Sequence, residues 1–287
     1  MTRRLVLAFG AAVAFSLAAS GVSVADVVAP ESEAGLVAED PTRYWPDPVS
    51  DIAALGAEER FYWLARSDHA SVLESPSLGD PLRIWVGGDS LSGGPAWGVE
   101  AKVKNDARYE LVQDIRKSTG VITEWYFDWR AYVRDEIAPA GFDVVVFSMG
   151  GNDAQRFRGF RGLVGSVEWS AQYSARVYEM IRFLDAPGRV VIWVGMPAVK
   201  PPQIAGLPQI VNPLAAEVTS RYRRAFYVDA MNIVSPGNQF VLSMADVDGV
   251  ERRVRVDDGV HYTVAGGRLV AVDIFSIIDA NTAAVVG

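Results

Sequence analysis

Residues 143–153 read DVVVFSMGGND, a nearly continuous hydrophobic run that ends in a polar stretch. Strands that are buried on both faces of a parallel sheet have this composition. A second run of the same kind, VVIWV at 190–194, follows further along the chain. The two runs predict the central strands of a parallel sheet.

Shorter runs and amphipathic segments alternate on either side of these strands. The predicted strands are residues 83–87, 109–115, 143–149, 189–196 and 225–228. The predicted helices are residues 96–105, 128–138, 168–184, 213–224 and about 263–279. Strands and helices that alternate in this way form a parallel sheet covered by helices, and such a sheet binds its ligands at the carboxyl ends of the strands.

One segment interrupts the alternation. Residues 240–256 have the pattern of a β-hairpin, with Asp248 and Gly249 as a two-residue turn. The hairpin leads directly into the sequence DGVH at 258–261. We therefore expect an α/β domain over residues 82–287, with an extra hairpin just before this sequence.

Residues 1–25 have the features of an export signal. Arg3 and Arg4 precede an apolar run at 5–19 that is short for a membrane span, and small residues lead up to Ala25. This pattern predicts cleavage after Ala25 and export to the periplasm, the cell envelope or the extracellular space. An uncleaved N-terminal anchor is the alternative.

Residues 26–81 separate the signal from the α/β domain. The first part is acidic, rich in proline and without helical or strand periodicity, which is typical of a linker. Residues 51–66 have the apolar spacing of an amphipathic helix, and residues 71–81 return to loop composition. The sequence thus predicts a linker with a helical extension in front of the domain.

Charge and composition exclude several classes of function. The chain has 287 residues, a net charge of −8, two histidines and no cysteine. An acidic protein is a poor match for nucleic acid or for an anionic membrane surface. The lack of cysteine excludes disulfides, thiol catalysis and cysteine-ligated metals. A single histidine with nearby acidic residues is too few ligands of the right kind for a zinc site. The sequence also has no glycine-rich phosphate-binding loop, so we expect neither a metal nor a cofactor.

Ser90, in the run GGDSL at 87–91, follows the first predicted strand. A serine hydroxyl is a weak nucleophile until a base takes its proton, and a neutral imidazole suits that task near pH 7. The candidate bases are His261 and His69. His69 lies in the N-terminal segment, where a surface residue is a simpler interpretation than a catalytic base. If 258–261 forms a helical turn, Asp258 lies against His261 and orients its ring.

Acyl transfer also needs hydrogen-bond donors for the oxyanion. The N–H of Ser90 is one candidate if a helix begins there, because first-turn amides lack an internal partner. Asn152, after the third strand, offers a side-chain amide, and Gly120, after the second, offers a backbone N–H. Asp89 and Asp153 are more simply explained as residues that bond nearby backbone amides or cap a loop.

The segments GDSL at 88–91, GGND at 150–153 and DGVH at 258–261 match, in order, the GDSL, GxND and DxxH blocks of the SGNH hydrolases. The chain resembles this superfamily from about residue 82 onward, and in particular its uncharacterised bacterial SGNH-like exported proteins. The resemblance implies a flavodoxin-like three-layer α/β/α fold with a five-stranded parallel sheet. It implies that the catalytic residues are Ser90, Asp258 and His261, and that the oxyanion donors are the Ser90 N–H, the Gly120 N–H and Asn152.

Other residues near these segments are candidates for substrate binding. Arg156 and Arg158, in a glycine-rich loop, would suit an anionic substrate such as an acidic polysaccharide, and a solvated charged loop is the alternative. The proline-rich stretch 198–213 would either wall the site or act as a stiff connector. The tryptophans that would stack on sugars, unless they belong to the core, are Trp97, Trp125, Trp129 and Trp169.

The expected function is that of an exported, metal-independent serine esterase that works through an acyl-enzyme. Export and the family resemblance favour short acyl groups such as acetyl on cell-envelope glycans. The alternatives are an O-acyltransferase with the same site and a non-catalytic envelope-binding module. The expected partner is a small-molecule or glycan ester, with no nucleic acid and no membrane span in the mature form.

Overall fold

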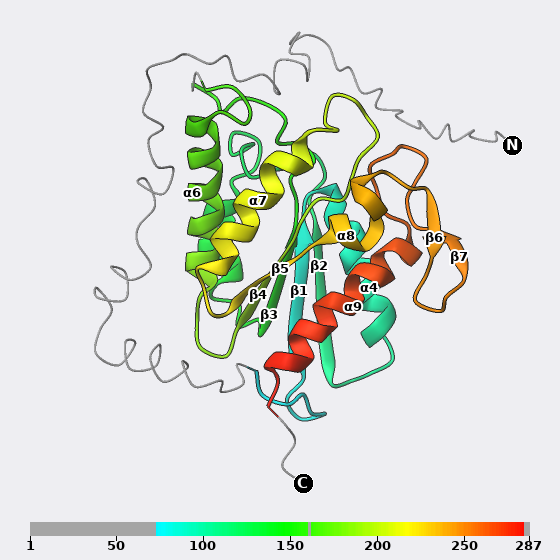
Figure 1. Cartoon of the computed structure of the whole chain (residues 1–287). Helices are drawn as coiled ribbons and strands as arrows, with labels where there is room; N and C mark the ends of the chain where they lie inside the picture. Colours follow the sequence, from blue (N-terminus) through cyan, green and yellow to red (C-terminus); the bar gives the residue numbers. More distant parts are fainter. Residues whose placement is uncertain (1–72, 160–161, 284–287) are drawn as a thin grey trace, which may run out of the picture.

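The computed structural model describes residues 73–159 and 162–283. The main sheet is parallel and has the strand order β2-β1-β3-β4-β5 (Figure 1). Its strands are β1 (Leu82–Gly88), β2 (Tyr109–Ile115), β3 (Val144–Ser148), β4 (Val190–Val194) and β5 (Ala225–Val228). The predicted flavodoxin-like fold is therefore confirmed. The export signal, the linker and the helix expected at 51–66 lie outside the described residues.

Helices cover both faces of the sheet (Figure 1). On one face α4 packs against α9, which also contacts the short α8. These helices are α4 (Gly93–Val103), α8 (Ala230–Val234) and α9 (Val264–Asn281). The helices of the other face are α5 (Trp129–Tyr132), the π-helical turn Val133–Ile137, α6 (Val167–Leu184) and α7 (Leu207–Ser220). This is the predicted three-layer α/β/α arrangement.

The two hydrophobic runs at 143–149 and 190–194 form the centre of the core. Every residue of β3 and β4 is buried, because strands flank both and helices cover both faces. Trp85, Trp129 and Phe147 pack edge to face there, with ring centroids 5.1 to 6.3 Å apart. Trp129 and Trp169 are buried core residues, which excludes both from stacking on a sugar.

The helix α7 begins earlier than the sequence predicted. Its first residue is Leu207, whereas the expected first residue, Pro213, lies inside the helix. Pro208 occupies the first turn, where its missing N–H needs no partner. The prediction was wrong because a proline usually marks a helix boundary rather than an interior position. The last part of the proline-rich stretch is therefore helix and not connector.

The predicted hairpin is present, but its turn is different. β6 (Ser243–Ala245) and β7 (Glu251–Arg253) pair antiparallel. The expected two-residue turn is wrong, because residues 246–250 form a longer loop. The Asp246 side chain closes this loop by accepting hydrogen bonds from the N–H groups of Asp248 at 2.9 Å and Val250 at 3.1 Å.

Glycines set the distance between α4 and α9. A Cβ atom on Gly98 would lie 2.1 Å from the carbonyl oxygen of Gly267, and one on Gly267 would lie 2.0 Å from that of Gly94. Such distances leave no room for any side chain, so only glycine permits this contact. The contact therefore sets how closely the helix that follows Ser90 approaches the helix that follows His261.

Candidate active site

Ser90 lies just beyond the carboxyl end of β1, where the strand order reverses between β1 and β3. Gly88 leaves the strand with a φ of +136°, a conformation that favours glycine. The Asp89 side chain then caps a short 3-10 helix, Ser90–Ser92, by accepting a hydrogen bond from the N–H of Leu91 at 2.7 Å. Ser90 begins this helix, so its N–H has no partner within it.

Asp89 joins the loop after β1 to the loop after β3. Its carboxylate is buried and also accepts hydrogen bonds from the N–H groups of Gly150 at 2.9 Å and Gly151 at 3.0 Å. Burial raises the pKa of Asp89 to about 6, against the lowering effect of these hydrogen bonds. The predicted structural role of Asp89 is confirmed.

Ser90, His261 and Asp258 form one hydrogen-bonded chain. His261 Nε2 lies 2.7 Å from Ser90 Oγ, and His261 Nδ1 lies 2.7 Å from Asp258 Oδ2. A neutral imidazole that carries its proton on Nδ1 donates to Asp258 and presents Nε2 to the serine hydroxyl. The side chains of His261 and Asp258 are 37% and 44% exposed, so this chain of groups is open to solvent.

The segment from Asp258 to His261 forms a turn that the carboxylate itself stabilises. Asp258 Oδ1 accepts hydrogen bonds from the N–H groups of Val260 at 2.8 Å and His261 at 3.0 Å. Gly259 permits the turn with a φ of +75°. Partial burial acts to raise the pKa of Asp258, but the hydrogen bonds from His261 and Val260 outweigh it and lower the pKa. The carboxylate is thus held ionised against the imidazole.

Arg255, which the sequence did not point to, fixes the backbone around His261. Its side chain is buried, and its guanidinium donates to the carbonyl oxygens of Ala198 at 2.8 Å, Val260 at 2.5 Å and His261 at 3.3 Å. It also lies 5.2 Å from the centroid of the Tyr262 ring. An arginine at the end of a hairpin is normally solvated, so the sequence carries no signal for this role.

The predicted oxyanion donors lie on loops that contact one another. Asn152 Nδ2 donates to the carbonyl oxygen of Thr119 at 2.7 Å, which leaves its second amide hydrogen available. Gly120 follows Thr119, and its N–H makes no hydrogen bond within residues 73–159 and 162–283. The structure therefore places Gly120 beside Asn152, and the Asp89 contacts bring the Ser90 loop to the same place.

Asp153 is a buried residue that supports the Gly120 loop. Its carboxylate accepts hydrogen bonds from the N–H groups of Val121 at 3.1 Å and Ile122 at 3.2 Å. A Cβ atom on Gly120 would lie 2.2 Å from Asp153 Oδ1, so only glycine fits there. Burial raises the pKa of Asp153 to about 8, although these hydrogen bonds act to lower it. The interpretation of Asp153 as a loop-stabilising residue is confirmed.

We expect the stability advantage of the wild type over Asp153→Asn to shrink as the pH rises. Below about pH 4 the carboxyl group is protonated in both the folded and the unfolded chain. Between about pH 4 and about pH 8 the unfolded chain releases this proton and the folded chain keeps it, so rising pH favours unfolding of the wild type. Thermal unfolding of both proteins, measured across this range, checks the expectation.

Asp273→Asn is the matched control, because Asp273 is exposed on α9. This variant should follow the pH dependence of the wild type. A wild-type advantage over Asp153→Asn that grows with pH would contradict the raised pKa of Asp153.

Of the residues considered for substrate binding, Arg158 and Trp125 are brought together. The guanidinium carbon of Arg158 lies 5.3 Å from the centroid of the Trp125 ring. Arg156 is exposed on the same loop as Arg158. Trp97 is 39% exposed on α4.

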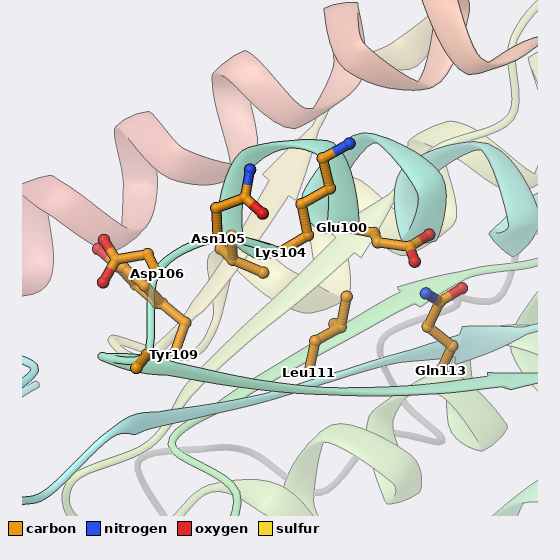
Figure 2. A pocket seen from close by; sticks show the side chains of 9 residues that line it. Glu100, Lys104, Asn105, Asp106, Tyr109, Leu111 and Gln113 are labelled. Atoms are coloured by element: carbon orange, nitrogen blue, oxygen red, sulfur yellow. The ribbon is translucent and has the colours of Figure 1, made fainter. Parts of the chain in front are cut away.

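The surface pocket in Figure 2 belongs to a different part of the molecule. It lies between the C-terminal end of α4 and the edge strand β2 and contains no candidate site residue. Labelled residues that line it include Glu100, Lys104, Asn105, Asp106 and Tyr109. Ser90 precedes α4, whose 11 residues span about 16 Å.

Two further observations concern only the part of the chain that the structure describes. There, no group of three or more His, Cys, Asp or Glu side chains is arranged to hold a metal ion. In the same ranges, 73–159 and 162–283, no helix has the length and apolar character needed to cross a membrane.

The protein has the SGNH hydrolase fold. This follows from its sheet order together with the serine after β1, the asparagine after β3 and the aspartate–histidine pair before α9. In this structure the loops after β1, β2 and β3 contact one another. The chain belongs to the family described as a protein of unknown function, DUF459, which it matches over residues 83–276.

Solved structures that are similar to this one include the following two. An α/β-hydrolase enzyme from the metagenome of Lake Arreo, Spain, is 14% identical, with 74% of this chain and 98% of that chain covered and a TM-score of 0.49. A catalytic mutant of an acetylxylan esterase from Geobacillus stearothermophilus is 13% identical, with 72% of this chain and 96% of that chain covered and a TM-score of 0.49. No curated protein matches the sequence.

Proposed function

We propose that this protein is a serine esterase in which Ser90 is the nucleophile, His261 the general base and Asp258 the group that orients the base. The observation that carries the proposal is the unbroken hydrogen-bonded chain through these three side chains, with both links at 2.7 Å. A serine hydroxyl needs this arrangement to lose its proton near neutral pH.

The reaction begins when Ser90 Oγ attacks the ester carbonyl carbon while His261 Nε2 takes the hydroxyl proton. The carbonyl oxygen becomes an oxyanion, which the N–H groups of Ser90 and Gly120 and the amide of Asn152 stabilise. The ester C–O bond then breaks, and His261 returns the proton to the leaving alcohol. Water, deprotonated by His261, attacks the acyl-enzyme, releases the acid and restores Ser90.

The proposed substrates are short acyl groups, such as acetyl, on glycans outside the cytoplasm. The features of an export signal at 1–25 support this location. The 37% exposure of the His261 side chain supports a bulky alcohol, because an open site accepts an ester carried on a large molecule. The chemistry itself requires only the residues already named.

Hydrolysis of p-nitrophenyl esters tests the proposal. We expect p-nitrophenyl acetate to be cleaved with a higher kcat/KM than the octanoate. Failure to cleave any ester would contradict the esterase proposal. A higher kcat/KM on the octanoate would contradict only the proposal that the acyl group is short.

A further inference from the structure

The loop after β2, which contains the candidate oxyanion donor Gly120, also carries two exposed aromatic side chains. Trp125 and Tyr126 are 54% and 60% exposed, whereas Ile122 before them and Trp129 after them are buried. Large aromatic rings are usually covered in a folded protein, and a pair left open beside a site is typical of a binding surface. Trp125 is five residues from Gly120, at most about 18 Å along the chain.

The backbone beneath the two rings is fixed. The N–H groups of Tyr126 and Phe127 both donate to the carbonyl oxygen of Thr123, at 2.8 and 3.0 Å. Phe127 packs inward against Trp129, edge to face, with ring centroids 4.9 Å apart. The turn is therefore anchored by Phe127 while Tyr126 and its neighbour Trp125 remain exposed.

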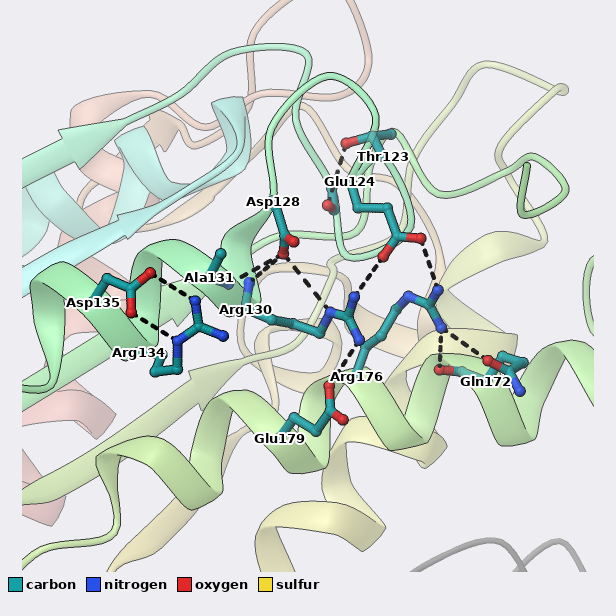
Figure 3. Close-up of polar contacts among 11 residues, drawn as sticks. Thr123, Glu124, Asp128, Arg130, Ala131, Arg134, Asp135, Gln172, Arg176 and Glu179 are labelled. Atoms are coloured by element: carbon teal, nitrogen blue, oxygen red, sulfur yellow. Dashed lines mark hydrogen bonds and ion pairs between the residues drawn. The ribbon is translucent and has the colours of Figure 1, made fainter. Parts of the chain in front are cut away.

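Ion pairs attach the same turn to α6 (Figure 3). Glu124, the residue before the two rings, pairs with Arg130 at 2.8 Å and with Arg176 of α6 at 3.0 Å. Arg130 also pairs with Glu179 of α6 at 2.8 Å. Arg176 in turn lies 4.3 Å from the centroid of the Phe157 ring, so it links the loop after β2 to the loop after β3.

Arg158 extends this link to the surface. It follows the buried Phe157, and its own side chain is exposed over the Trp125 ring, 5.3 Å from the centroid. The loops after β2 and β3 thus meet in the interior, through Asn152 with Thr119 and Asp153 with Val121 and Ile122, and also at the surface, through Arg158 and Trp125. Trp125, Tyr126 and Arg158 therefore lie on the same two loops as the candidate oxyanion donors Gly120 and Asn152.

We infer that Trp125, Tyr126 and Arg158 form a subsite for the sugar part of a negatively charged, acylated glycan whose ester lies at Ser90. The inference rests on the proposed esterase function. Aromatic faces stack on the C–H faces of sugar rings, and a guanidinium pairs well with a carboxylate. A guanidinium beside the rings is a poor neighbour for a long acyl chain, which favours sugar as the occupant.

Charge supports an anionic rather than a neutral glycan. Acidic residues outnumber basic ones in the chain, which has a net charge of −8. Arg158 and Arg156, both exposed on the loop after β3, supply positive charge beside the two rings. Positive charge placed locally on an acidic protein directs an anionic ligand to that place.

Two variants of the full chain, Trp125→Ala and Arg158→Gln, test the subsite. The substrates are p-nitrophenyl acetate, an O-acetylated cello-oligosaccharide, which is neutral, and an O-acetylated oligogalacturonide, which is acidic. We expect Trp125→Ala to lower kcat/KM on both glycans at least about tenfold more than on p-nitrophenyl acetate, mainly through KM. Arg158→Gln should produce such a selective loss only on the acidic glycan.

Leu78→Ala is the control, because Leu78 is 78% exposed in the loop before β1, at the amino end of the strand and thus at the opposite end from Ser90. This variant should affect kcat/KM on all three substrates equally. An equal loss on all substrates in Trp125→Ala, or no loss on either glycan, would overturn the subsite. With p-nitrophenyl octanoate as a fourth substrate, a loss confined to it would assign the rings to the acyl chain and would also overturn the subsite.

A binding measurement separates this inference from the esterase proposal. If the wild type cleaves none of the esters, the esterase proposal fails. Calorimetric titration of the wild type with deacetylated oligogalacturonide then still tests the subsite. Binding that Trp125→Ala and Arg158→Gln each weaken about tenfold would support the subsite, and no binding would reject it.

Discussion

In the Ser90→Ala variant, kcat for p-nitrophenyl acetate falls by about 10⁴-fold or more. Alanine has no oxygen to form the acyl-enzyme, and the remaining oxyanion donors can only assist water. Folding changes little, because Ser90 Oγ contacts His261 at a partly exposed site. We expect the melting temperature to change by less than about 4 °C, the effect of about 1 kcal/mol on a domain of this size.

Ser276→Ala is the matched control for this experiment. Ser276 is exposed on α9, and its hydroxyl donates to the carbonyl oxygen of Val272 at 2.9 Å. This variant should keep the activity of the wild type. Turnover by Ser90→Ala at the rate of Ser276→Ala would contradict the assignment of Ser90 as nucleophile.

The Arg255→Met variant loses both stability and activity. Removing the guanidinium leaves the carbonyl oxygens of Ala198 and Val260 without their donor, whereas that of His261 still accepts from the N–H of Val256 at 2.8 Å. Each such group left unpaired costs about 1–3 kcal/mol, so we expect a loss of about 2 kcal/mol or more. For a domain of this size, about 2 kcal/mol lowers the melting temperature by about 4–8 °C. A shift of His261 relative to Ser90 also lowers kcat, by about 100-fold for a displacement of 1 Å.

Arg253→Met is the control, because Arg253 has the same side chain two residues earlier. It is 51% exposed and pairs with Asp257 at the surface. Exposed pairs of this kind contribute about 0–1 kcal/mol, so the control should melt near the wild type. Thermal melting and p-nitrophenyl acetate turnover measure both variants. Equal behaviour of the two would contradict the role of Arg255 in holding His261.

Much of the fold could be predicted from the sequence because its central strands are buried on both faces. The runs at 144–148 and 190–194 contain little but large apolar residues, and they became β3 and β4. The start of α7 could not be predicted, because nothing local indicates that Pro213 is tolerated inside a helix. The hairpin turn was predicted too short, because its closure depends on the Asp246 side chain.

The chemical groups of the site could be predicted because acyl transfer restricts them to a few residue types. Ser90, Asp258 and His261 stand in short segments at the ends of predicted elements, and the fold brings them into contact. Arg255 could not be predicted, because its role depends on the carbonyl group of the distant Ala198 and on the way the turn at Val260 folds back on it. The contact of Gly98 with Gly267, which sets the distance between α4 and α9, is likewise visible only in three dimensions.

The central claim is that Ser90 is an activated nucleophile, and covalent labelling tests it most directly. A fluorophosphonate reacts with an activated serine hydroxyl and not with ordinary surface serines. Peptide mass spectrometry of the folded, labelled protein locates the adduct. We expect one adduct, on Ser90, and none on Ser90 after unfolding in urea, when His261 no longer lies beside it. A folded protein that remains unlabelled at Ser90 would contradict the claim.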